Sequence, residues 1–297
     1  MNNFFLDKIT KLKNEHAQDT NHQEATEELR KFVTDKNLRN NFSLQELNDE
    51  EMRKLLKSIT GKKSLGLDWI CSYSLKLVSE ELLPELKTII NLSIRSGKFG
   101  TPWKLSKVLP GWKNKGSRSD SQFYRPISNL SEVSKLCERA IHDQLYKFLM
   151  DNKLIHSNHY GFLKKCSTAN ALQHIVDLWL QSIDKSKINA ALFLDLSAGF
   201  HVINLDLLLY KLKYYNFDES TILWFESYLK GRHQCVQIES AFSSLLPVHR
   251  GVPQGSILGP ILFLLFINEL PNIVSETGEN HPAGNITERV SHNSVHG

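Results

Sequence analysis

The stretch GVPQGSILGPILFLLFINELP, residues 251–271, joins two glycines to a long apolar run. Gly251 and Gly255 permit a positive φ or a close approach of the backbone to a neighbour or a ligand. Between them, the amide of Gln254 can donate to and accept from a sugar or a base edge. The pattern predicts a tight turn that presents backbone and amide groups to a ligand, and an ordinary turn is the alternative.

The second half of this stretch predicts a buried helix. Ser256 is a candidate N-cap, and Pro260 falls in the first turn, where its missing N–H costs nothing. We expect the helix to run to about Leu270 and to end at Pro271. The apolar run ILGPILFLLFI is too short to span a bilayer and is interrupted by glycine and proline. The helix is therefore expected inside a protein core.

A second apolar run, INAALFLDL at residues 188–196, lies upstream and includes Asp195. Such a run is typical of a buried strand that delivers a carboxylate to the edge of a cleft. A carboxylate in that position is costly unless it binds a cation or another partner. The alternative is an exposed aspartate at a strand end.

Residues 107–128, KVLPGWKNKGSRSDSQFYRPIS, are rich in glycine and lysine and predict an extended ribbon with a mobile tip. Lys113, Lys115 and Arg125 could clamp a triphosphate, the arginine in a bidentate manner. Residues 101–150 hold nine lysines and arginines against four acids, an excess of five positive charges that suits phosphates. A solvated basic loop is the alternative.

Helical periodicity and capping residues mark further elements, and their alternation with strands in the second half indicates an α/β (α+β) chain. A helix is expected within residues 42–59, capped by Ser43 or Asn48, and another within 81–97, with Gly97 near its end. Residues 134–152, 206–215 and 219–232 also predict helices, the last capped by Ser220 or Thr221. Residues 233–240 and 244–252 can pair as a hairpin.

The whole-chain composition sets the remaining expectations. With 297 residues, 41% of them hydrophobic, the chain can bury one large domain or two smaller ones. The N-terminus lacks the apolar core of a signal peptide, and no transmembrane run is present, so an intracellular protein is expected. The four cysteines are not close neighbours in the sequence and predict reduced thiols: Cys71, Cys137, Cys166 and Cys235.

Seven sequence blocks, taken in order, resemble the reverse transcriptase domain of non-LTR retrotransposons of the LINE or jockey type. They are GKKSLGLDWI, FGTPWKLSKVLPGWKNKG, YRPISNLSEVSKLCERAI, HYGFLKKCSTANAL, LFLDLSAGF, YLKGRHQCVQI and GVPQGSILGPILFLLFINELP. The resemblance covers about residues 42–274. It implies a right-hand polymerase that copies RNA into DNA by two-metal phosphoryl transfer, with fingers and palm in this chain.

The resemblance also implies roles for single residues. Asp195 matches the first metal-binding, catalytic aspartate, and the carbonyl of Leu196 matches a second metal ligand. The implied nucleotide-binding residues are Lys113 or Lys115, Arg125, Phe200, Gln254 and Gly255. Phe200 is the aromatic that packs under the sugar. The implied cofactor is Mg²⁺, or Mn²⁺, and the implied partners are an RNA template, a DNA primer and a deoxynucleoside triphosphate.

The sequence departs from the family pattern at several positions. His201 stands where the family usually has aspartate, and Leu163 where it has arginine. Leu65, Leu67 and Trp69 occupy the family's proline and glycine positions. The last aspartate is Asp218, so the family's Tyr-Ala-Asp-Asp hairpin does not follow, and no acid such as Glu269 is expected to replace it.

These departures predict a chain that is truncated before the Tyr-Ala-Asp-Asp motif, lacks a thumb and is inactive as a polymerase. The expected divisions are a polar, weakly packed helical extension at 1–41, a helical region leading into the fingers at 42–99, fingers with an incomplete palm at 100–274, and an unrelated disordered tail at 275–297. The alternative function is that of a non-catalytic nucleic-acid-binding remnant, or of a decayed element with no selected function.

Overall fold

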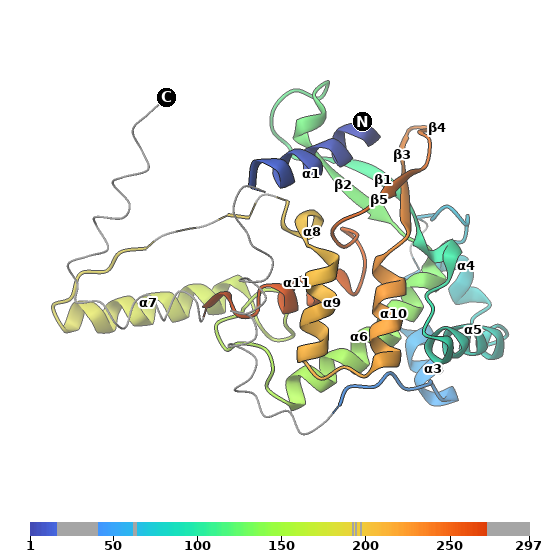
Figure 1. Cartoon of the computed structure of the whole chain (residues 1–297), viewed down its shortest axis with the longest axis horizontal. Coiled ribbons are helices and arrows are strands. Elements are labelled where there is room, and N and C mark those ends of the chain that lie inside the picture. Colours follow the sequence, from blue (N-terminus) through green and yellow to red (C-terminus); the bar gives the residue numbers. More distant parts are fainter. Residues whose placement is uncertain (17–40, 62–63, 192, 194, 197, 272–297) are drawn as a thin grey trace.

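The computed structural model describes residues 1–16, 41–61, 64–191, 193, 195–196 and 198–271 (Figure 1). These residues form a mixed α/β structure in which a small sheet lies against a larger body of helices. The expectations for residues 17–40 and for the tail at 275–297 lie outside the described residues.

The sheet is mixed, with the strand order β2-β1-β3-β4 and with β5 also paired to β3. Its strands are β1 (Leu105–Trp112), β2 (Tyr124–Asn129), β3 (Arg232–Ile238), β4 (Ala241–Phe242) and β5 (Leu246–Val248). β1 and β2 are antiparallel, which confirms the ribbon expected at 107–128. β3 and β5 are also antiparallel, which confirms the expected hairpin. β1 and β3 run parallel, and this pairing joins the two halves of the chain.

Most of the described helices lie to one side of the sheet, and α1 lies across it (Figure 1). They are α1 (Asn2–His16), α3 (Asp49–Lys57), α4 (Ser72–Leu77), α5 (Leu83–Ser96), α6 (Glu132–Asp151), α7 (Thr168–Asp184), α8 (Gly199–Val202), α9 (Leu205–Tyr214), α10 (Glu219–Leu229) and α11 (Gly259–Phe266). Two short 3₁₀ turns, η1 (Thr101–Lys104) and η2 (Ser121–Phe123), flank the strands β1 and β2.

Side-chain caps fix several helix ends. Asn48 forms a capping box with Glu51 at the start of α3, and Gly97 ends α5 with a φ of 63°, as the sequence predicts. The cap expected for α10 at Ser220 or Thr221 was wrong by two or three residues, because Asp218 accepts the cap bond from the Thr221 N–H. α11 ends at Phe266, earlier than expected, although Leu270 and Pro271 are again helical.

The main core lies between the helices. Side chains of α3, α5, α6, α9, α10 and α11 form one buried apolar cluster, in which Trp224, Phe225 and Tyr228 of α10 are among the largest members. The indole of Trp224 donates to the Ser93 hydroxyl over 3.0 Å, so its polar atom is satisfied. This core holds α11 and the turn before it against α6 and α9.

The buried strand expected at residues 188–196 is wrong for the residues that the structure describes. They adopt no strand, and Ile188 and Phe193 are exposed. A strand that is apolar on both faces needs neighbouring strands to pair its backbone groups and helices to cover its sides. None of the described strands pairs with this segment. The preceding helix, α7, extends away from the body of the molecule and buries none of its side chains (Figure 1).

The expectation of weak packing at the N-terminus is also wrong for α1. Phe5 is buried against Val108 of β1 and Val236 of β3. The side chain of Asn2 is buried as well, and it exchanges hydrogen bonds with Gln234 at 3.2 Å and 2.9 Å. The polar helix α1 thus packs on the sheet through the side chains of Phe5 and Asn2.

Candidate nucleotide-binding site

The turn at residues 251–256 is tied to α8 by backbone hydrogen bonds. The N–H of Gly251 donates to the Ile203 carbonyl over 3.0 Å, and the N–H of Val252 donates to the Phe200 carbonyl over 2.8 Å. Gly251 has a φ of 74°, and a Cβ at this position would lie 2.5 Å from the Cα of His201. Only glycine allows so close an approach. The structure therefore brings the GFH and GVPQG blocks together.

The same turn is also held against β2. The N–H of Ser128 donates to the Gln254 carbonyl over 2.8 Å. Gly255 has a φ of 124°, and a Cβ there would collide with the Ser128 carbonyl oxygen. Gly255 is thus required by backbone conformation and by close contact together.

We expect Gly255→Ala to destabilise the protein by about 1–3 kcal/mol, because it combines a strained φ with a collision against backbone. Urea unfolding measures the loss. The matched control is Gly161→Ala, since a Cβ at Gly161 meets no atom within 4 Å. Equal stability of the two variants would contradict the assigned role of Gly255.

Glu138 of α6 anchors the chain just after the turn, and the sequence analysis missed it. Its carboxylate is fully buried and accepts from the N–H groups of Ile257 at 2.7 Å and Leu258 at 3.2 Å. Burial raises the pKa of Glu138, and the Arg232 charge and these hydrogen bonds oppose the rise. The signal was present in the sequence, because Glu138 falls on the buried stripe of α6 with Ser134, Ile141 and Leu145.

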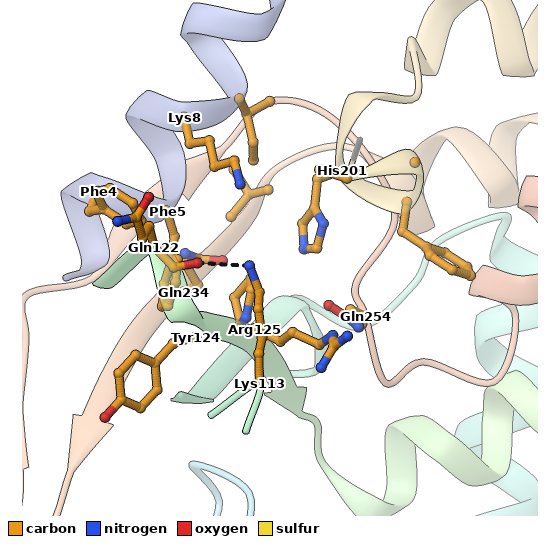
Figure 2. A pocket seen from close by; sticks show the side chains of 16 residues that line it. Phe4, Phe5, Lys8, Lys113, Gln122, Tyr124, Arg125, His201, Gln234 and Gln254 are labelled. Carbon is orange, nitrogen blue, oxygen red and sulfur yellow. Dashed lines mark hydrogen bonds between the residues drawn. The ribbon is translucent and has the colours of Figure 1, made fainter. Parts of the chain in front are cut away.

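A cavity of about 220 Å³ lies between the sheet, α1, α8 and the turn (Figure 2). Four of the predicted site residues line it: Lys113, Arg125, Phe200 and Gln254. Lys113 follows β1 and Arg125 belongs to the adjacent strand β2, whereas Phe200 belongs to α8, so the cavity joins the β1–β2 ribbon to a distant segment of the chain. The ring of Phe200 is held by Phe263 at 5.0 Å and Phe162 at 5.6 Å, measured between ring centroids.

The cavity is positively charged. Lys8, Lys113, Arg125 and His201 line it, and none of its described lining residues is an aspartate or a glutamate. Burial lowers the pKa of Lys113, with smaller contributions from the charges of Lys8, Arg125 and Lys115. Burial also lowers the pKa of His201, and Lys8 adds to the effect. Lys8, Lys113 and Arg125 are cations that converge with no carboxylate among the described lining residues, and this favours an anionic ligand.

Four predicted residues do not line this cavity: Gly255, which packs against β2, and Lys115, Asp195 and Leu196. Lys115 is exposed on the loop between β1 and β2. Asp195 and Leu196 lie in the exposed segment before α8 and outside the cavity. In the part of the chain that the structure describes, no group of three or more histidine, cysteine, aspartate or glutamate side chains could hold a metal ion. The described residues therefore do not fit a complete divalent-metal site.

Comparison with known proteins shows the family to which this chain belongs. Residues 113–283, which include Lys113, Arg125, Phe200 and the turn, match the family described as "Reverse transcriptase (RNA-dependent DNA polymerase)". The match covers more than half of the chain. The chain belongs to the reverse transcriptase family. This reverse transcriptase domain is of the LINE or jockey type, as its relatives indicate.

Two curated relatives come from Drosophila melanogaster. The chain is 31% identical over 228 residues to "Probable RNA-directed DNA polymerase from transposon BS". It is 30% identical over 222 residues to "RNA-directed DNA polymerase from mobile element jockey". Each alignment covers 75% of this chain and 24% of the relative. The reverse transcriptase domain described here thus spans about a quarter of the length of the relatives it matches.

A helix must be both long and apolar to cross a bilayer. Within the described ranges, no helix combines the length and the apolar content that crossing a membrane requires. The apolar α11 is eight residues long and is buried in the helical core.

Proposed function

We propose that this chain forms the nucleotide-binding part of a retrotransposon RNA-directed DNA polymerase, and that its cavity holds the incoming deoxynucleoside triphosphate. The observation that carries the proposal is the meeting of Lys113, Arg125, Phe200 and Gln254 around one cavity. In this assignment β1, β2 and their loop belong to the fingers, and α8, β3 and the turn belong to an incomplete palm, within residues 100–274.

Each lining residue has a chemical role in this proposal. Arg125 presents a planar guanidinium that can bind phosphate oxygens in a bidentate manner, and Lys113 adds a point charge. Phe200 offers an apolar face to the sugar. The side-chain amide of Gln254 can donate to or accept from the sugar or base. The backbone carbonyl of Gln254 accepts from the Ser128 N–H and holds the turn in place. Gly255 keeps this backbone close to β2.

The proposed partners are an RNA template and a DNA primer, which basic residues of the fingers would contact through their phosphates. The family generally uses divalent metal ions, and Mg²⁺ or Mn²⁺ is the proposed ion. Asp195, with the Leu196 carbonyl, would supply one side of the metal site. Since the described residues do not fit a complete site, we assign no step of the reaction to a metal here.

Nucleotide affinity tests the proposal. We expect Arg125→Ala to weaken binding of a fluorescent deoxynucleoside triphosphate by at least tenfold, the scale of a lost hydrogen bond to a charged group. Lys113→Ala should weaken it similarly. Lys115→Ala is the matched control, because Lys115 is exposed and lies outside the cavity. If all three variants bind alike, or if the unaltered chain does not bind, the proposal fails.

We also expect weak binding of single-stranded RNA that does not depend on base sequence and that falls steeply with salt. The reason is the excess of positive charge at residues 101–150, since each neutralised phosphate releases counterions. Filter binding over a salt series measures the slope. An affinity that ignores salt, or that survives the replacement of Lys113, Lys115 and Arg125 by alanine, would contradict this expectation.

This chain by itself is expected not to extend a primer. Two-metal catalysis needs carboxylates from separate strands, and His201 replaces an aspartate with an imidazole, which suits softer metals. The measurement is primer extension on a homopolymer RNA template with Mg²⁺ or Mn²⁺. Template-directed incorporation that Asp195→Ala abolishes would prove the expectation wrong. A chain that binds RNA and nucleotide but does not extend would favour the alternative of a non-catalytic binding remnant.

A further inference from the structure

The docking of α1 places an additional cation beside the proposed nucleotide. Phe5 and Asn2 fix α1 on β1 and β3, as described above. One helical turn after Phe5, Lys8 occupies a neighbouring position on the same side of the helix. Together with Phe4, Phe5 and Ile9, Lys8 forms the wall of the cavity that faces the β1–β2 loop and α8.

Figure 2 shows Lys8, Lys113, Arg125 and His201 around one space, each from a different element. Lys8 lies close enough to affect both Lys113 and His201, because its charge contributes to the lowered pKa of each. The ammonium of Lys113 donates to the Gln122 carbonyl over 2.7 Å, which leaves donors over for a ligand. No carboxylate among the described lining residues balances the charges of Lys8, Lys113 and Arg125.

We propose that Lys8 is a ligand-binding residue of this site and that α1 contributes it to the polyphosphate of the incoming nucleotide. The inference rests on the proposed function, and it goes beyond the residues that the sequence blocks assign. Lys113 and Arg125 reach the anion from the sheet, and Lys8 reaches it from the opposite wall. An anion held between the two walls would be contacted by cations on two sides, which relieves their mutual repulsion.

The proposal commits α1 to a binding role and not to a blocking role. A helix that merely covered the cavity would need no charge directed into it. Instead, the one lysine of α1 among the cavity's described lining residues faces the same space as Lys113 and Arg125. Lys11, the next lysine along α1, does not line the cavity.

The test compares Lys8→Ala with Lys11→Ala in the full chain, using dATP and inorganic tripolyphosphate as probes in competition with a fluorescent nucleotide. We expect Lys8→Ala to weaken both probes about tenfold or more, the scale of a lost charged hydrogen bond, and Lys11→Ala to leave them unchanged. Lys8→Arg should restore affinity, which a general unfolding of α1 would not explain. Loss for dATP but not for tripolyphosphate would overturn the assignment to the polyphosphate.

The remaining outcomes separate this inference from the proposed function. If Lys113→Ala and Arg125→Ala weaken binding while Lys8→Ala behaves like Lys11→Ala, the role of Lys8 is overturned and the proposed function stands. If Lys8→Ala binds more tightly, α1 obstructs the site and the inference is wrong. If the unaltered chain binds neither probe, the proposed function fails and the inference fails with it.

Discussion

Lys211→Met is expected to destabilise the protein by about 3–5 kcal/mol, the cost of leaving one partner of a buried ion pair uncompensated. The ammonium of Lys211 on α9 pairs with the Glu269 carboxylate at 2.5 Å, and both side chains are more than nine-tenths buried. Glu269 also accepts from the Tyr215 hydroxyl over 2.6 Å. Glu269→Leu should have a comparable effect. Urea unfolding, followed by circular dichroism, measures both.

The double variant Lys211→Met/Glu269→Leu should cost less than the sum of the two single variants by more than about 1 kcal/mol, because it removes both charges together. A matched control is Lys230→Met. Lys230 pairs with Asp206 and Glu226 but is 43% exposed, so its loss should cost less than about 1 kcal/mol. Additive single effects would show that Lys211 and Glu269 do not act as a pair.

This network also explains why Glu269 is a poor candidate for the acid that the sequence lacks. Its carboxylate is buried and engaged by Lys211 and Tyr215, and it is not among the residues that line the nucleotide cavity. The neighbouring Asn268 donates to the Tyr215 hydroxyl and to the Leu154 carbonyl, both over 2.7 Å. The INELP block therefore works in this structure as an anchor for the end of the α11 segment.

Glu138→Leu should be about as severe, with an expected loss of about 2–6 kcal/mol, because two buried N–H groups at 257 and 258 would lose their acceptor. Nucleotide affinity should fall as well, since the turn that carries Gln254 would lose its support. The two measurements are urea unfolding and nucleotide titration. A stable Glu138→Leu variant that binds nucleotide normally would contradict this positioning role.

Glu138→Gln is the conservative control, because an amide oxygen can still accept both N–H groups. Burial raises the pKa of Glu138 in the folded chain above its ordinary 4.5. The stability that its protonated form contributes is therefore full below that value and is lost as the pH rises through the folded pKa. The variant does not titrate, so its stability relative to the unaltered chain should improve over that same pH range.

Local features of the sequence were sufficient to predict much of the fold. The glycines at 251 and 255 predicted a close turn because only glycine tolerates that backbone, and the structure has both with positive φ. Asn48 and Gly97 predicted helix ends because capping depends on a few neighbouring residues. Likewise, the order of the sequence blocks was sufficient to predict the reverse transcriptase family.

Trp69 departs from the family's sequence pattern, and the structure shows what this departure does to the backbone. The sequence places it at one of the family's proline and glycine positions, and its φ is 58°, in the left-handed region that glycine adopts freely and a bulky side chain adopts only at a cost. The side chain is 64% exposed and lies edge-on to Phe242, at 6.4 Å between ring centroids. The turn thus keeps the backbone that a glycine would suit, at a cost in strain.

Tertiary structure decided what depends on partners far away in the chain. The run at 188–196 predicted a strand from its apolar pattern, but a strand exists only where another strand pairs with its backbone, and none of the described strands does. Glu138 and Lys211 lie on the buried faces of α6 and α9, and their partners lie 119 and 58 residues away. Lys8 lines the cavity only because Phe5 docks on β1 and β3. Conformational preferences and periodicity are local properties that the sequence encodes directly, whereas the pairing of backbone groups and buried charges is settled only when distant segments pack together.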